Sequence, residues 1–231
     1  GPRRAIDSGP RPHVIGGALE TLFLAFCSFP IDAYMLSFPM VQEYIDGIGV
    51  GYFALFYKGL CIDSYQHERI REAPPSGGVS VCAKTVDYDN LRKYGELLLS
   101  NLKWSGVAMV EFKKLKDDKL VLMEINPKFW GSLDLGIKAG ANLPLSIINT
   151  LNAEDSDVFV YQTNYHKNLR FQWPLDGDIK YMFVSLPRFF SVLKDIVNPR
   201  VKSNLNFLND PMPTIVQITS IIFNFLKGWF K

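Results

Sequence analysis

The sequence predicts an α+β fold in which helices pack on an antiparallel sheet. Strand-like runs are joined by short turns, as at Lys58-Gly59, and residues 88–102 repeat apolar side chains at the three- and four-residue spacing of a helix. The 231 residues are 48% hydrophobic and 21% charged, which is enough apolar material for a packed core. We therefore expect a folded chain of one domain with an appendage, or of two small domains.

The strands are predicted from short runs of β-branched, aromatic and other apolar residues between turn signals. Residues 67–78, which are polar and rich in Pro and Gly, are predicted as a loop, and His67 as a solvated loop residue. The predicted strands are residues 39–45, 51–57, 60–65, 106–115, 120–126 and 171–173.

The helices are predicted from apolar periodicity and from their stop and start signals. Pro30 follows the first helix, Gly140 ends a later one, and Pro144 begins the next. The predicted helices are residues 17–26, 88–102, 133–138 and 144–151, part of 178–195, and 214–230. The polar stretch 152–157 marks a boundary, which divides the chain into 1–45, 46–155 and a mainly helical extension, 156–231.

Charge and cysteine usage exclude several classes of protein. A formal charge of +2 excludes a polycation built for nucleic acid, and we expect no nucleic-acid partner. Cys27, Cys61 and Cys82 are odd in number and widely spaced, so neither a disulfide framework nor a zinc site is predicted. Reduced structural thiols in a cytoplasmic protein are the expectation.

The last predicted helix is apolar around much of its circumference and ends in Lys227, Trp229 and Lys231. A helix docked on the domain or on a partner protein has this composition, and so does a peripheral membrane helix. Docking is the commoner case. The sequence does not predict the oligomeric state.

The most informative stretch is the hairpin formed by residues 106–115 and 120–126. If Asp117-Asp118 are its two turn residues, Lys116 faces Lys119 and Glu111 faces Glu124. Asn126 then lies on the same face as Glu124, two residues along the strand.

Two carboxylates placed opposite each other, ~5 Å apart at Cβ, repel, and burying them is costly. A divalent cation relieves both penalties, and Mg²⁺ favours one or two carboxylates with an amide oxygen and substrate phosphates. The alternative is an exposed Glu at a sheet edge, because a one-residue slip would undo the pairing.

At this point the chain resembles the ATP-grasp superfamily of ATP-dependent ligases, and within it the carbamoyl-phosphate-synthase-like carboxylate–amine ligases. The resemblance covers residues 3–151 and depends on the order and spacing of several motifs. These are Val41-Gln42-Glu43-Tyr44-Ile45, Arg69-Ile70-Arg71-Glu72-Ala73-Pro74-Pro75-Ser76-Gly77-Gly78, Glu111, and Glu124-Ile125-Asn126-Pro127-Lys128-Phe129-Trp130-Gly131-Ser132.

The resemblance implies a nucleotide site along the first motif. Gln42, Glu43, Tyr44 and Ile45 match a hinge strand whose main chain binds adenine, although an ordinary core strand would read the same way. The implied fold is the ATP-grasp C-terminal subdomain, residues 46–155, preceded by a remnant of the N-terminal lobe.

The resemblance also implies catalytic and metal-binding residues. Arg69 and Arg71 match basic positions that face phosphate groups, and alternation in an extended segment predicts that both point the same way, although loop arginines on the surface would look alike. Lys128 stands where many relatives have Arg, and Phe129 and Trp130 are predicted to pack rather than to contact substrate. The implied magnesium ligands are Glu111, Glu124 and Asn126.

The reaction implied is ATP- and Mg²⁺-dependent joining of a small-molecule carboxylate to an amine through an acyl-phosphate, with Mn²⁺ as an alternative metal. Gly1 stands about where relatives carry a phosphate-binding Lys, so we expect a fragment of a longer enzyme. The alternative hypothesis is a non-catalytic ATP-grasp remnant that acts as a binding or interaction module.

Overall fold

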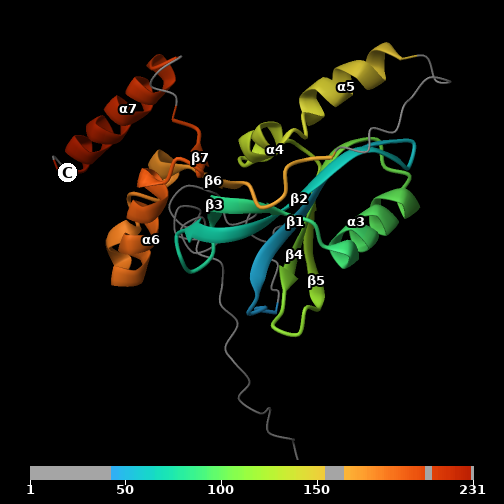
Figure 1. Cartoon of the computed structure of the whole chain (residues 1–231), viewed down its shortest axis with the longest axis horizontal. Helices are drawn as coiled ribbons and strands as arrows, with labels where there is room; N and C mark the ends of the chain where they lie inside the picture. The colour runs from blue at the N-terminus through green and yellow to red at the C-terminus, as the bar shows by residue number, and fades with distance from the viewer. Residues whose placement is uncertain (1–42, 154–163, 206–209, 230–231) are drawn as a thin grey trace, which may run out of the picture. The chain divides into compact units, whose positions relative to one another are not determined.

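The structure, a computed structural model, describes residues 43–153, 164–205 and 210–229. The chain divides into two units, Gly1–Asp46 and Gly47–Lys231, and the described residues of the second unit carry the fold (Figure 1). The predicted helix 17–26 and most of the predicted strand 39–45 lie outside the described residues. Glu43, Tyr44 and Ile45 are described and form no strand, so that part of the strand prediction is wrong.

The second unit is built on a seven-stranded sheet in the order β5-β4-β1-β2-β3-β6-β7, antiparallel except between β6 and β7. This confirms the α+β class and the antiparallel sheet. The strands are β1 (Ile48–Tyr57), β2 (Leu60–Ala73), β3 (Val79–Val86), β4 (Gly106–Lys114), β5 (Leu120–Asn126), β6 (Arg170–Gln172) and β7 (Lys202–Ser203). The last two continue the same sheet beyond residue 155.

The predicted loop over residues 67–78 is wrong for its first half. Residues 67–73 extend β2, and β3 was not predicted at all. The reason is that polar side chains of β2 find partners across the fold: Tyr88 Oη donates to Glu68 Oε2 at 2.6 Å, and Lys84 pairs with Glu68 at 3.0 Å. Because these polar residues occupy buried positions of the strand, the sequence lacks the alternation of apolar and polar residues that identifies a strand.

The turn between β1 and β2 is the predicted one. Lys58 and Gly59 both have positive φ, 51° and 84°, which is the backbone of a type I′ hairpin turn.

Helices cover both faces of the sheet. The helix α3 (Asp89–Asn101) packs on one face against β1 and β2, and α4 (Leu133–Ala139) and α5 (Leu143–Asn152) pack on the other (Figure 1). Gly140 ends α4 with φ 102°, as its position in the sequence predicts. We call the face under α4 and α5 the ligand face, because the predicted metal ligands also lie on it.

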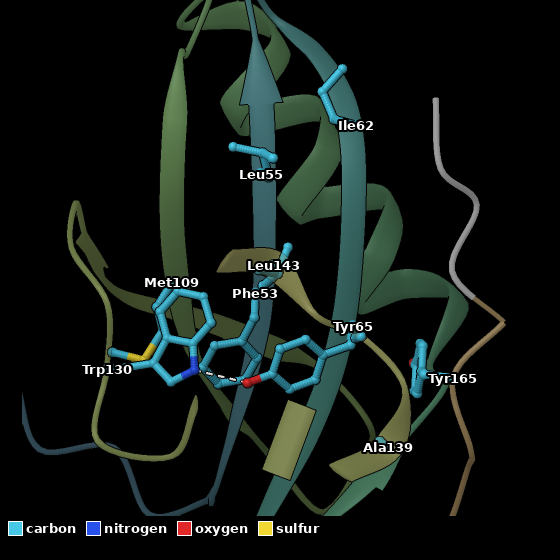
Figure 2. Packing of buried hydrophobic residues seen from close by; sticks show 10 residues of the cluster. Phe53, Leu55, Ile62, Tyr65, Met109, Trp130, Ala139, Leu143 and Tyr165 are labelled. Atoms are coloured by element: carbon cyan, nitrogen blue, oxygen red, sulfur yellow. Dashed lines mark hydrogen bonds between the residues drawn. The ribbon is translucent and has the colours of Figure 1, made fainter. Parts of the chain in front are cut away.

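An aromatic cluster fills the core of the ligand face (Figure 2). The rings of Phe53 and Tyr65 stack with centroids 4.8 Å apart, and Trp130 Nε1 donates to Tyr65 Oη at 2.8 Å. Trp130 therefore packs, as predicted. The ring of Phe129 lies 6.1 Å from that of Trp130 between centroids, and its side chain is 41% exposed, so it packs only in part.

The C-terminal part contributes two short 3₁₀ helices, η2 (Pro174–Asp176) and η3 (Met182–Val184), followed by α6 (Leu186–Val197) and α7 (Met212–Trp229). The α7 helix is held to η2, since Gln217 Nε2 donates to Asp176 Oδ1 at 2.6 Å. Among the described helices, none is both long and apolar enough to cross a membrane.

Candidate functional site

The β4–β5 hairpin places Glu111 directly opposite Glu124, as the sequence predicts. The turn that leads to this pairing differs from the predicted one. Leu115 N–H donates to Lys119 O at 2.8 Å, so the loop has three residues, and Asp118 adopts φ 61°. The predicted pairing of Lys116 with Lys119 is therefore wrong.

A β-bulge restores the expected register. Near the turn Lys114 pairs with Leu120 and Phe112 with Leu122, one residue away from the predicted register. The register then shifts between Phe112 and Glu111, which leaves Met123 as the extra residue of the bulge. The extra residue in the turn shifts the register by one position and the bulge shifts it back, so the two glutamates face each other.

Asn126 completes the predicted set of ligands on the ligand face. It lies opposite Met109, a core residue of that face, two positions from the glutamate pair. Among the described residues, Asn126 Oδ1 is one of the few buried side-chain oxygens with no hydrogen-bond partner. A buried amide oxygen without a partner is costly unless a ligand satisfies it.

Arg69 reaches this group from β2 by crossing the central strand β1. Its Nη2 lies 2.7 Å from Glu111 Oε2, and its Nη1 lies 3.0 Å from Glu72 Oε1. The crossing requires Gly49, since a Cβ there would lie 2.7 Å from Arg69 Cδ. A glycine in the central strand thus clears the path of the guanidinium.

The electrostatics of Glu111 match those of a binding site. Burial raises the pKa of its carboxyl, Arg69 opposes that rise, and Glu124 reinforces it. The side chain of Glu111 is 14% exposed, whereas Glu124 is exposed. One carboxylate is thus held inside the fold while its neighbour faces solvent.

His67 lies on the same face, and the prediction that it is a solvated loop residue is wrong. It is 2% exposed instead of solvated, its ring meets Phe53 edge-on at 4.3 Å, and its Nδ1 is buried without a hydrogen-bond partner in the described structure. Burial, with Arg69 nearby, lowers the pKa of the imidazole to about 3. The alternation Tyr65, His67, Arg69 is the signal that would have placed it on this face.

Arg71 does not join Arg69, so the prediction that both arginines point the same way is wrong. Arg69 pairs with Ala83 and Arg71 with Cys82, which makes Ile70 an extra residue and turns Arg71 to the opposite face. There its guanidinium bonds Asp178 at 2.5 Å and Asp195 at 2.6 Å.

The remaining predicted site residues are those of the first motif and Lys128. Gln42 is outside the described residues, Glu43 and Tyr44 are exposed, and Ile45 is half-buried. Lys128 is exposed in the segment that follows β5. A groove of about 680 Å³, which lies along α7 and Leu175, contains none of the predicted ligands.

The donor set fits a hard divalent cation. Two carboxylates and an amide oxygen on neighbouring positions are oxygen ligands of the kind that Mg²⁺ prefers, and the unpartnered Asn126 Oδ1 is the observation that carries the fit. Within the described residues there is no cluster of three or more His, Cys, Asp or Glu side chains able to hold a metal. Substrate oxygens would therefore have to complete the coordination shell.

The fold around this group is a mostly antiparallel sheet covered by helices, and a comparison with protein families bears on its class. Residues 67–173 match the family described as "ATP-grasp in the biosynthetic pathway with Ter operon". This match, which runs from β2 to just beyond β6, covers a little under half of the chain and confirms the expected resemblance to the ATP-grasp superfamily. The closer likeness to carbamoyl-phosphate-synthase-like ligases stays a prediction.

Solved structures of similar fold include a phosphoribosylaminoimidazole carboxylase ATPase subunit from Aquifex aeolicus, at 18% identity and TM-score 0.42, covering 56% of this chain and 44% of that one. The biotin carboxylase domain of Hydrogenobacter thermophilus 2-oxoglutarate carboxylase, in complex with MgADP, gives 14% identity, TM-score 0.43 and coverages of 56% and 30%. An L-amino acid ligase from Bacillus licheniformis has 17% identity and a TM-score of 0.37, and the match covers 51% of this chain and 32% of that one. These likenesses carry no argument about function.

The chain spans less than half of the length of these three structures. No curated protein matches it in sequence.

Proposed function

We propose that this chain is part of an ATP- and Mg²⁺-dependent carboxylate–amine ligase. The single observation that carries the proposal is the arrangement on the ligand face, where Glu111 and Glu124 are in register and the amide oxygen of Asn126 lacks a partner. A structural role alone does not explain why two like charges and an unsatisfied oxygen are gathered there.

In the proposed reaction a substrate carboxylate oxygen attacks the γ-phosphorus of ATP, and the bond to the β-phosphate oxygen breaks to release ADP. An amine nitrogen then attacks the carbonyl carbon of the acyl-phosphate, so that a C–N bond forms and phosphate leaves with loss of the amine proton. When bound, Mg²⁺ neutralises charge on the phosphate oxygens. Mn²⁺ is the alternative metal.

The residues of the chain position and neutralise charge, and none of them acts as a nucleophile. Glu111, Glu124 and Asn126 would hold the cation through their oxygens. Arg69 holds Glu111 at 2.7 Å and fixes that carboxylate before any ligand arrives. The adenine-binding role of Gln42 to Ile45 and the phosphate role of Lys128 remain proposals from the resemblance, as does Arg71, whose guanidinium is occupied elsewhere.

The test is calorimetric titration of the chain with ATP in Mg²⁺, repeated after EDTA. We expect binding that requires the metal and that weakens by at least about tenfold in Glu111→Gln and in Glu124→Gln. Asp117→Asn is the matched control, because it removes one carboxylate from the exposed hairpin tip and should bind like the wild type.

Binding that is equal in all variants would refute the proposed site. Absence of nucleotide binding in the wild type would favour the alternative, a non-catalytic ATP-grasp module.

A further inference from the structure

The helix α6 has its polar side toward the protein and its apolar side toward solvent. Arg188, Ser191 and Asp195 share one stripe at three- and four-residue spacing and face inward, where Asp195 is 4% exposed. The opposite stripe is exposed: Leu186 73%, Phe190 63%, Leu193 42% and Val197 70%. A solvent-facing helix normally has the reverse arrangement.

The orientation of α6 is fixed by a buried ion cluster. Arg71 Nη1 lies 2.6 Å from Asp195 Oδ2 and donates to Ser191 Oγ at 2.9 Å, and Arg170 Nη2 also lies 2.6 Å from Asp195 Oδ2. Rotating α6 by half a turn about its own axis would bury its apolar stripe, but it would also break these charge-assisted hydrogen bonds. The apolar stripe therefore faces outward because the ion cluster holds the helix from within.

A neighbouring segment enlarges this apolar surface. In η3, which immediately precedes α6 in the chain, Phe183 is 76% and Val184 is 64% exposed. Exposed apolar surface of this extent on neighbouring elements indicates an interaction site.

The charges around the stripe indicate which kind of partner it fits. Between residues 177 and 205, the exposed charged side chains are all cationic: Lys180, Lys194, Arg200 and Lys202; the acid just before this range, Asp176, is exposed and accepts hydrogen bonds from Asn204 and Gln217. The two acids of that range, Asp178 and Asp195, are buried in the ion cluster.

We infer that α6 and η3, which pack against each other, form a docking surface for an anionic lipid bilayer. An apolar helix stripe bordered by Lys and Arg is the pattern of helices that lie in the membrane interface. Insertion of Phe183, Leu186 and Phe190 below the headgroups would bury the stripe, while the cationic rim would contact anionic headgroups. The surface lies on the membrane without spanning it, and the inference does not depend on the proposed ligase activity.

The test is co-sedimentation of the full 231-residue chain with phosphatidylcholine vesicles, with and without about 30% phosphatidylserine. We expect binding to the anionic vesicles that falls as salt is raised. The double variant Leu186→Asp with Phe190→Asp should reduce the bound fraction by at least about tenfold, since it removes two inserted side chains and adds negative charge.

Two further variants separate the contributions. Lys194→Gln with Lys202→Gln should weaken binding to anionic vesicles about 30-fold and leave neutral vesicles unaffected. The matched control is Leu145→Asp with Ile148→Asp, which makes the same chemical change at similarly exposed positions of α5 and should bind normally.

Three outcomes would overturn the inference. One is wild-type protein that stays in the supernatant with anionic vesicles while its circular dichroism shows a folded chain. Another is equal vesicle binding by the α6 and α5 variants. The third is a sedimentation-velocity dimer without lipid that the α6 variant abolishes, which would make a second copy the occupant of the stripe.

Discussion

Arg69 and Arg71 are two residues apart on the same strand, yet they serve two different kinds of charge cluster. Arg71 is enclosed by Asp178 and Asp195 and its side chain is 6% exposed. Arg69 joins Glu111 and Glu72 at partly exposed positions, beside a second carboxylate and an unpartnered amide oxygen.

The difference shows how a charge cluster that stabilises the fold can be distinguished from one that is suited to bind a ligand. Around Arg71 both buried acids have cationic partners: burial alone would lower the pKa of the guanidinium, but the hydrogen bonds that it donates to Asp178 and Asp195 outweigh burial and raise the pKa. On the ligand face, acids outnumber nearby bases and polar atoms are left over. The first cluster therefore stabilises the fold, and the second is suited to bind a cation.

The largest expected effect is in the cluster around Arg71. Arg71→Met should destabilise the protein by about 3–5 kcal/mol, because Asp178 and Asp195 stay buried without their main partner. Urea unfolding followed by circular dichroism at pH 7 measures it. Arg170→Met, which removes a more exposed partner of Asp195, should cost much less; equal losses in both variants would contradict the ranking.

The second effect concerns His67. The pKa of its imidazole is about 3 in the folded protein and 6.5 in the unfolded chain. Between these values the imidazole binds a proton in the unfolded chain and stays neutral in the folded protein. Stability should fall by about 1.4 kcal/mol per pH unit as the pH drops from about 6 to 4. Unfolding free energies across this range should lose that slope in His67→Gln; a slope identical to the wild type would contradict the burial argument.

Asp63 provides a comparison of opposite sign. Burial raises the pKa of its carboxyl to about 6, in spite of a 2.6 Å hydrogen bond from Ser146. The contribution of Asp63 to the stability of the folded state is fully present below about pH 4 and is lost as the pH rises through about 6. Asp63→Asn should therefore make the acid-side loss of stability steeper than in the wild type, and a shallower profile would be the contrary result.

A smaller effect is expected from Arg69. Arg69→Met should cost about 1–2 kcal/mol, because Glu111 loses a charge-assisted hydrogen bond. Millimolar Mg²⁺ should restore part of this stability in thermal melts, since a cation can replace the guanidinium beside Glu111. Arg71→Met should show no such rescue, and rescue of both variants or of neither would remove the distinction between the two clusters.

The smallest effect is expected from Glu124. Because its side chain faces solvent and repels Glu111, Glu124→Gln should change the unfolding free energy by no more than about 0.5 kcal/mol. Urea titration without divalent cations checks this. A large loss would show that Glu124 supports the fold, which would weaken its proposed role as a ligand.

The sequence by itself determined the features that depend on neighbours along the chain. Strand alternation was enough to place Asn126 and Glu124 on one face, whereas the pairing of Glu111 with Glu124 was predicted correctly because the longer turn and the bulge offset each other. The Lys58-Gly59 turn, the helix over residues 88–102 and the stop at Gly140 are likewise set by local backbone preferences.

Only the tertiary structure decided which face each charged residue occupies where a bulge interrupts the strand. The extra residue Ile70 separates Arg71 from Arg69, and partners more than 100 positions away in the sequence hold Arg71 and turn the apolar stripe of α6 outward. His67 became a core residue for the same kind of reason. Such placements follow from long-range pairing and burial, which no local spacing encodes, because their free energy arises only when distant segments meet.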